Sequence, residues 1–127
     1  MSEHISSSDA AAPVAAYSQA VSAGDLVFVS GQIPLNPDSG ELIASSIEAA
    51  TRQSLQNVER ILVAAELTLE HIVKATVFLI DSEDYAGMDS TYREIMPQPF
   101  PAREAVFVAG LPKDARVEIS VIAHQNR

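Results

Sequence analysis

Residues 71–80, with the sequence HIVKATVFLI, decide the fold of this chain, because apolar side chains occupy both alternating sets of positions in the run. Successive side chains of a β-strand point to opposite faces of its sheet. A strand that is apolar on both faces is typical of the middle of a sheet that is covered on both sides. We therefore expect residues 71–80 to form a central strand. In an oligomer, a neighbouring subunit can supply the second cover.

Strand and turn signals precede this run. Residues 17–23 and 26–30 are strand-like and are separated by a Gly-Asp dipeptide, which predicts a β-hairpin. Residues 36–40, NPDSG, form a turn by their chemistry, since proline presets φ, the Asp and Ser side chains bond to local backbone, and glycine accepts a positive φ. Residues 1–12 are rich in Ser and Ala and lack periodicity, so we expect a flexible, loosely docked lead-in.

Two helices are expected, one before and one after the central strand. The first begins near Ser45, which can form a capping box with Glu48, and its apolar stripe continues for about five turns. The second is expected to use Ser82 as its N-cap and to run to about Met96. The proline-rich segment 97–101 then enforces an extended chain, because proline cannot continue a helix.

Two final strands are expected at residues 103–109 and 116–123, joined by a turn at residues 110–114. The resulting order, β-β-α-β-α-β-β, predicts an α+β fold in which two helices pack on one face of a mixed sheet. A chain of 127 residues fits a single domain over residues 1–127.

Two helices leave the second face of such a sheet uncovered, and apolar strand residues are too numerous to remain in water. We therefore expect self-association through the sheet. The residues on which this expectation rests are Val27, Val29, Val77, Leu79, Val106, Val108, Val117 and Ile119.

Composition excludes several classes of function. The net charge of −9 disfavours a nucleic-acid partner, whose affinity would rest on lysine and arginine. No apolar run approaches the roughly 18 residues of a membrane span, so no membrane partner is expected. The absence of cysteine excludes disulfides and thiol catalysis, and the three histidines lack metal-motif spacing, so no metal is expected. The N-terminus shows no targeting signal, which predicts a cytoplasmic location.

Arg103 and Glu118 are the side chains best suited to carry chemistry. Strand alternation puts Arg103 on the same face as Ala105, and Glu118 on the same face as Ser120. If the last two strands pair through the turn near Gly110, Arg103 and Glu118 fall at similar heights and share one cleft wall. Arginine binds a carboxylate through two parallel hydrogen bonds, and glutamate can hold a water and take its proton. The alternative is a cross-strand or intersubunit salt bridge.

Several motifs along the chain, taken together, resemble the RidA/YjgF family of reactive-intermediate deaminases. The resemblance extends from about Pro13 to Ala123, with the motifs in family order and at near-family spacing. The motifs are SGQIPLNP at 30–37, RQSLQNV at 52–58, VKATVF at 73–78, FPAR at 100–103, LPKD at 111–114 and VEI at 117–119.

The resemblance implies a chorismate-mutase-like α+β fold assembled as a homotrimer, with three clefts at subunit interfaces. It implies hydrolysis of short 2-imino acids, such as 2-iminobutanoate and 2-iminopropanoate, to 2-keto acids and ammonia without a cofactor. In the family, the residue at Arg103 binds the substrate carboxylate and the one at Glu118 positions the hydrolytic water. Tyr17, Ser30 and Gly31 correspond to pocket-lining positions. From the residues alone, Tyr17 could equally be an interface aromatic, and Ser30 and Gly31 could simply end a strand.

Two further substrate-site positions depart from the family pattern. Asp89 stands where well-known members have asparagine, and Ala105 stands where many have cysteine. If Asp89 faces the cleft, its charge would repel an anionic substrate or raise the pKa of Glu118. Ala105 removes any thiol switch. Ser120 replaces a second glutamate that often follows the one at Glu118.

Two other functions remain open. One is a non-catalytic trimer that binds small molecules, with a regulatory or chaperone-like role. The other is the endoribonuclease activity for which some relatives were named. The presence of both Arg103 and Glu118 favours catalysis, the lack of cysteine disfavours redox-sensitive chaperone activity, and the acidic charge disfavours RNA.

Overall fold

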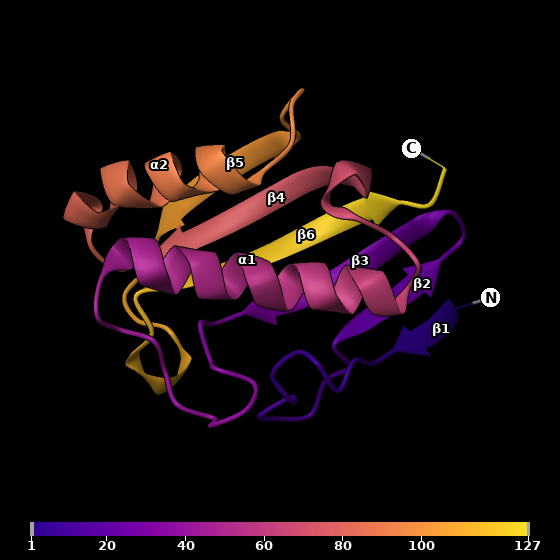
Figure 1. The fold of residues 1–127 in the computed structure, drawn as a ribbon, viewed down its shortest axis with the longest axis horizontal. Helices are drawn as coiled ribbons and strands as arrows, with labels where there is room; N and C mark the ends of the chain where they lie inside the picture. Colours follow the sequence, from indigo (N-terminus) through magenta and orange to yellow (C-terminus); the bar gives the residue numbers. More distant parts are fainter. Residues whose placement is uncertain (1, 127) are drawn as a thin grey trace.

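A six-stranded mixed sheet carries both long helices on one face (Figure 1). The computed structural model describes residues 2–126. The expected α+β fold with two helices on one face is confirmed, and within residues 2–126 no helix is both long and apolar enough to cross a membrane. The elements are β1 (Ser2–Ile5), β2 (Ala20–Ala23), β3 (Leu26–Gln32), α1 (Ile47–Ala64), β4 (Ile72–Leu79), α2 (Tyr85–Ile95), β5 (Ala102–Phe107) and β6 (Val117–His124).

The strand order is β1-β2-β3-β6-β4-β5, so β4 lies inside the sheet as the sequence predicts. It pairs antiparallel with β6 and parallel with β5. Ala75, Val77 and Leu79 of β4 are buried beneath the helices. Thr76 and Phe78 on the opposite face are only partly covered, so the chain itself covers one face of its central strand.

The expectation that the last two strands pair with each other is wrong, because β4 lies between β5 and β6. The connection from β4 through α2 to β5 is a parallel crossover, which places β5 on the outer side of β4. The chain must then pass the end of β4 to reach β6. Lys113 and Asp114 make this passage with positive φ angles of 56° and 59°.

Both helices begin at other residues than expected. Ser46, not Ser45, caps α1, and its hydroxyl accepts a 3.0 Å hydrogen bond from the Ala49 amide. Ser82 does not cap α2. Asp81 instead caps a short 3₁₀ turn at Ser82–Asp84, and α2 starts at Tyr85. Neighbouring residues of equal capping ability compete, and the backbone path decides between them.

Part of the expected lead-in is a strand. β1 pairs antiparallel with β2 at the edge of the sheet, which corrects the expectation for residues 1–12 within the described residues. Edge pairing needs backbone hydrogen bonds but no buried side-chain face, so the sequence of β1 shows no apolar alternation. The buried Gln19 amide anchors the following segment by donating a 2.7 Å hydrogen bond to the Ala11 carbonyl.

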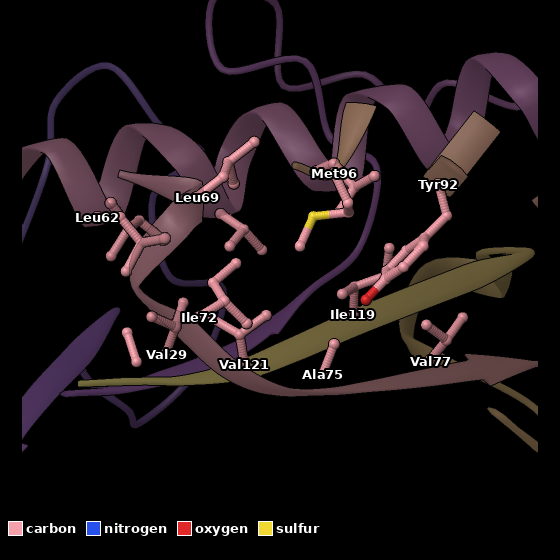
Figure 2. Close-up of a cluster of buried hydrophobic side chains, with 14 of the residues drawn as sticks. Val29, Leu62, Leu69, Ile72, Ala75, Val77, Tyr92, Met96, Ile119 and Val121 are labelled. Carbon is pink, nitrogen blue, oxygen red and sulfur yellow. The ribbon is translucent and has the colours of Figure 1, made fainter. Parts of the chain in front are cut away.

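The main core lies between the helices and the sheet. Figure 2 shows Tyr92 pointing from α2 toward the sheet near Ile119, with Met96 beyond the end of the same helix. Six of the residues expected on the uncovered face belong to this core: Val27, Val29, Val77, Leu79, Val117 and Ile119. They were assigned to the wrong face because alternation separates two faces without telling which of them the helices cover.

The opposite surface, which we call the open face, mixes apolar and polar side chains. Phe28 and Val106 are 43% and 39% exposed there. Self-association through this face stays a prediction, now resting on a different and smaller apolar set. The open-face residues of β3, β6, β4 and β5 include Phe28, Lys74, Thr76, Phe78, Glu104, Val106, Glu118, Ser120 and Ile122.

Candidate active site

The candidate residues divide between two pockets on opposite faces of the sheet. Arg103 is paired in register with buried Ala75 and lies on the helix side. Glu118 is paired with Phe78 and lies on the open face. The expectation that Arg103 and Glu118 share one cleft wall is therefore wrong within a single chain. The intervening strand β4 and the opposite strand phases of the two residues separate them.

The first pocket, which we call the glutamate pocket, has a volume of about 290 Å³. It brings together three predicted site residues with Glu118, and its lining is otherwise mainly apolar. Within residues 2–126, no cluster of three or more His, Asp or Glu side chains suits a metal ion. The lining residues are Val14, Ala15, Tyr17, Ser30, Gly31, Ile33, Pro112 and Glu118.

Gly31 lies directly beneath the Glu118 carboxylate. The register of β3 against β6 shifts between Val29 and Gln32, which brings the Gly31 backbone close to Glu118. A Cβ atom at position 31 would stand 2.7 Å from Cδ of Glu118, closer than real contacts allow. The lack of a side chain at Gly31 therefore leaves the space that the carboxylate occupies.

Glu118 is a half-buried carboxylate without a cationic partner among residues 2–126. Burial raises its pKa above the ordinary value for glutamate. The ion pairs present in the described residues all involve other carboxylates. A carboxylate in this position can change its protonation state more easily near neutral pH, which suits a group that takes up and returns a proton.

Tyr17 and Ser30 form the wall beside Glu118. The Ser30 hydroxyl donates a 2.6 Å hydrogen bond to the Ser18 carbonyl, so it holds the chain next to Tyr17 in place. Its oxygen can still accept a hydrogen bond from a ligand. Tyr17 is 42% exposed, and its hydroxyl accepts a long 3.4 Å bond from the Val14 amide. The Tyr17 hydroxyl hydrogen is thus available to a pocket ligand.

The second pocket, which we call the arginine pocket, has a volume of about 300 Å³ and is formed by α2, β5 and the segment between them. Arg103 is its central side chain and is only 18% exposed. Two hydrogen bonds hold its guanidinium, one to Asp89 at 2.9 Å and one to the Tyr85 hydroxyl at 2.7 Å. These bonds use only part of the donor capacity of an arginine. The lining residues are Asp89, Tyr92, Arg93, Phe100, Pro101 and Arg103.

A contact with an aromatic ring also holds the Arg103 guanidinium in place. The guanidinium carbon of Arg103 lies 4.8 Å from the centroid of the Tyr92 ring, and the ring itself is buried. An arginine stacked on an aromatic face keeps its hydrogen-bonding edges available. Arg103 is therefore oriented for an anion before any ligand arrives.

Asp89 faces the arginine pocket and not the glutamate pocket. The hydrogen bond from Arg103 holds the pKa of Asp89 below its ordinary value, and a second bond from Arg93 at 3.2 Å acts in the same direction. Asp89 is consequently ionised, but its charge is offset by two guanidiniums. The expected effect of Asp89 on Glu118 is not found within the chain, since burial is the cause of the raised pKa of Glu118.

Sequence reasoning placed one site residue incorrectly and missed two. Ala105 does not line the arginine pocket but packs against the main core. The sequence did not single out Tyr85, whose hydroxyl accepts a hydrogen bond from Arg103, or Arg93, which donates to Asp89. Spacing could have found them, because Tyr85, Asp89 and Arg93 recur every four residues on one face of α2.

These features define a class of protein: a small α+β protein with two helices on a six-stranded mixed sheet, a partly buried arginine near one sheet edge and a half-buried glutamate on the open face. The family model described as Endoribonuclease L-PSP matches residues 7–125. The chain belongs to this family, and the resemblance to RidA/YjgF proteins is confirmed.

Similar proteins span nearly the whole chain. A RutC family protein of Pyrococcus horikoshii is 43% identical over 98% of this chain and 99% of its own length. The 2-iminobutanoate/2-iminopropanoate deaminase of Escherichia coli strain K12 is 44% identical over 97% of this chain and 98% of its own. The crystal structure of RidA from an Antarctic Psychrobacter has a TM-score of 0.92 at 38% identity and covers 96% of this chain and 98% of that protein.

Proposed function

We propose that this protein hydrolyses short 2-imino acids, including 2-iminobutanoate and 2-iminopropanoate, to 2-keto acids and ammonia. The observation that carries the proposal is Glu118, a half-buried carboxylate on the wall of a small pocket, with a raised pKa and no ion pair to any cation of residues 2–126. The family includes deaminases named for this reaction at 44% identity, which supports the same chemistry here.

The reaction requires the protein to orient the substrate and to supply one group that carries a proton. Water attacks C2 of the protonated imine, a C–O bond forms while the C=N π pair moves to nitrogen, and Glu118 takes the proton that the water loses. The carbinolamine that results has a C–N bond to break, and Glu118 returns the proton to its nitrogen. The C–N electron pair then leaves with ammonia while the hydroxyl oxygen becomes the keto group and gives its proton to Glu118, which releases it to solvent. No electrons are transferred to or from another reactant.

Four other predicted site residues have a role in this proposal: Arg103, Tyr17, Ser30 and Gly31. Arg103 binds the substrate carboxylate through the donors that Asp89 and Tyr85 leave available. The hydroxyl groups of Tyr17 and Ser30 contact the substrate beside Glu118. Gly31 allows the substrate and the carboxylate to approach the backbone.

The proposed site joins two copies of the chain, because Arg103 and Glu118 of one copy lie on opposite faces of the sheet. Contact through the open face would cover Phe28 and Val106, which are exposed in the single chain. A closed ring of three copies makes every such contact equivalent and leaves no unmatched surface. We therefore propose a homotrimer with three clefts, each receiving Glu118 from one copy and Arg103 from the next.

RNA cleavage, the activity in the family's name, is less well supported by this chain. A net charge of −9 repels the phosphate backbone, and the pocket that holds Glu118 has a mainly apolar lining.

A coupled assay tests the proposal. Threonine dehydratase generates 2-iminobutanoate, semicarbazide competes for it, and semicarbazone formation is followed with the wild type, Arg103→Ala and a matched control, Arg52→Ala. Arg52 is an exposed arginine of α1 that pairs with Glu94 and lies outside both pockets. We expect the wild type and the control to suppress semicarbazone formation, and Arg103→Ala to lose about 10- to 100-fold in kcat/KM.

Two outcomes would oppose the proposal. Folded wild-type protein that fails to suppress the semicarbazone would remove imine hydrolysis. If that same protein still binds 2-oxobutanoate through Arg103, the non-catalytic binding function takes its place.

A further inference from the structure

Two arginines share one carboxylate in the arginine pocket. Arg103 donates to Oδ1 of Asp89 at 2.9 Å, and Arg93 donates to Oδ2 of the same side chain at 3.2 Å. The charged lining of the pocket therefore carries one excess positive charge in a chain whose net charge is −9. The other ion pairs of residues 2–126 are one-to-one: Arg52 with Glu94, Lys74 with Glu104 and Arg116 with Asp84.

Arg93 lies at the rim of the pocket and Arg103 at its base. The Arg93 side chain is 64% exposed, compared with 18% for Arg103. Its guanidinium carbon lies 5.8 Å from the centroid of the Phe100 ring, which also lines the pocket. Asp89 and Phe100 thus hold the Arg93 guanidinium over the opening, with most of its donors exposed to an incoming ligand.

We infer that the arginine pocket prefers a ligand with two carboxylates, and that dicarboxylic 2-imino acids are better substrates than monocarboxylic ones of equal chain length. The inference rests on the proposed function, because it takes Arg103 as the ligand of the carboxylate next to the imine carbon. Arg93 then binds the distal carboxylate. The two guanidiniums contact the two oxygens of a single side chain, so a short carbon chain can reach both.

The size and charge of the pocket agree with this ligand class. A volume of about 300 Å³ holds a small organic acid. A second carboxylate gains a charge-assisted hydrogen bond at Arg93, whereas a methyl group at that end meets a hydrated guanidinium. The excess positive charge favours the dianion further.

A matched pair of keto acids tests the inference. Isothermal titration calorimetry measures binding of 2-oxopentanedioate and 2-oxopentanoate, which differ only in the distal carboxylate, to the wild type, Arg93→Gln and the control Arg52→Gln. We expect the wild type and the control to bind the dicarboxylate about tenfold more tightly. Arg93→Gln should lose this preference, while its affinity for 2-oxopentanoate falls only about two- to fivefold, since the loss of one positive charge acts on both acids and Arg103 is unchanged.

Each contrary result has its own meaning. Wild-type protein that binds both acids equally, or Arg93→Gln that keeps the preference, overturns the inference and leaves the proposed function standing. Wild-type protein that binds neither acid overturns both. Loss of 2-oxopentanoate binding in Arg93→Gln would also overturn the inference, because Arg93 would then support Arg103 and not the distal carboxylate.

Discussion

In the arginine pocket, the guanidinium of Arg103 has two hydrogen-bond partners and an aromatic ring beneath it, whereas the carboxylate of Glu118 in the glutamate pocket faces a glycine and mainly apolar side chains. Both charged groups are partly shielded from water. The two groups differ in the hydrogen-bond and aromatic partners that the fold places beside them. Partners fix the position of the Arg103 guanidinium, whereas burial without a cationic partner among residues 2–126 raises the pKa of Glu118.

This contrast matches two different tasks. Binding an anion needs a group of constant charge and direction. Moving a proton needs a group whose two protonation states are close in free energy, and desolvation of Glu118 brings them closer. We expect activity to be most sensitive to a change at Glu118 itself and least sensitive to one at Asp89.

Glu118→Gln removes the proton carrier and keeps the shape of the side chain. We expect kcat/KM for 2-iminobutanoate to fall about 10²- to 10⁴-fold, the range that a general acid or base contributes. Binding of 2-oxobutanoate, measured by calorimetry, should change little because Arg103 is intact. Full activity in Glu118→Gln would show that the two pockets do not divide the tasks as proposed.

Gly31→Ala places a methyl group where the Glu118 carboxylate now lies. The carboxylate must move, so we expect a loss of about 10- to 100-fold in kcat/KM, as for a small misplacement of a reacting group. Gly110→Ala is the matched control, because a Cβ atom there meets nothing within 4 Å. Equal rates for both variants would mean that the position of Glu118 is unimportant.

The pH dependence of the wild type should report Glu118. The base acts when ionised, and burial raises its pKa, so kcat/KM should decline about tenfold per unit of pH once the pH falls below that raised pKa. The acid limb should therefore begin at a higher pH than for an exposed glutamate. The measurement is the rate above the uncatalysed hydrolysis. The residual activity of Glu118→Gln should lack this limb, and the same limb in that variant would assign it to another group.

Asp89→Asn removes the shared carboxylate charge from the arginine pocket. We expect KM for 2-iminobutanoate to fall about two- to fivefold, because the positive charge near the substrate carboxylate is no longer offset by Asp89. Glu94→Gln removes a carboxylate from the same helix outside the pocket and serves as control. A rise in KM for Asp89→Asn would mean that Asp89 mainly orients Arg103.

Local patterns predicted the elements of the fold better than their arrangement. The apolar run at residues 71–80 identified the central strand, and the turn at residues 36–40 forms as expected, with the Asn36 side chain accepting from the amides of Asp38 and Ser39. The position of β5 was not predictable in this way, because which strands become neighbours depends on the crossover through α2 and on contacts far apart in sequence.

For the candidate site too, the residues were easier to predict from the sequence than their arrangement. Arg103 and Glu118 were identified by residue type and family resemblance, and each lines a pocket, although the two do not share the single cleft that was expected. Their placement on opposite faces depends on strand phase and strand order, which the sequence does not specify locally. Arg93 was missed because its importance comes from sharing Asp89 with Arg103, a contact between α2 and β5.

The chain passes the end of β4 at Lys113 and Asp114, and this path affects how the sequence of the protein can evolve. The passage puts β4 between β5 and β6, and the opposite strand phases of Arg103 and Glu118 place these two residues on opposite faces of the sheet. Residues around Arg103 can vary to suit a new acid without altering the surroundings of Glu118. In an assembly of unlike copies, one subunit could then supply the recognition of the substrate and its neighbour the reactivity, so that two damaged chains together form an intact site.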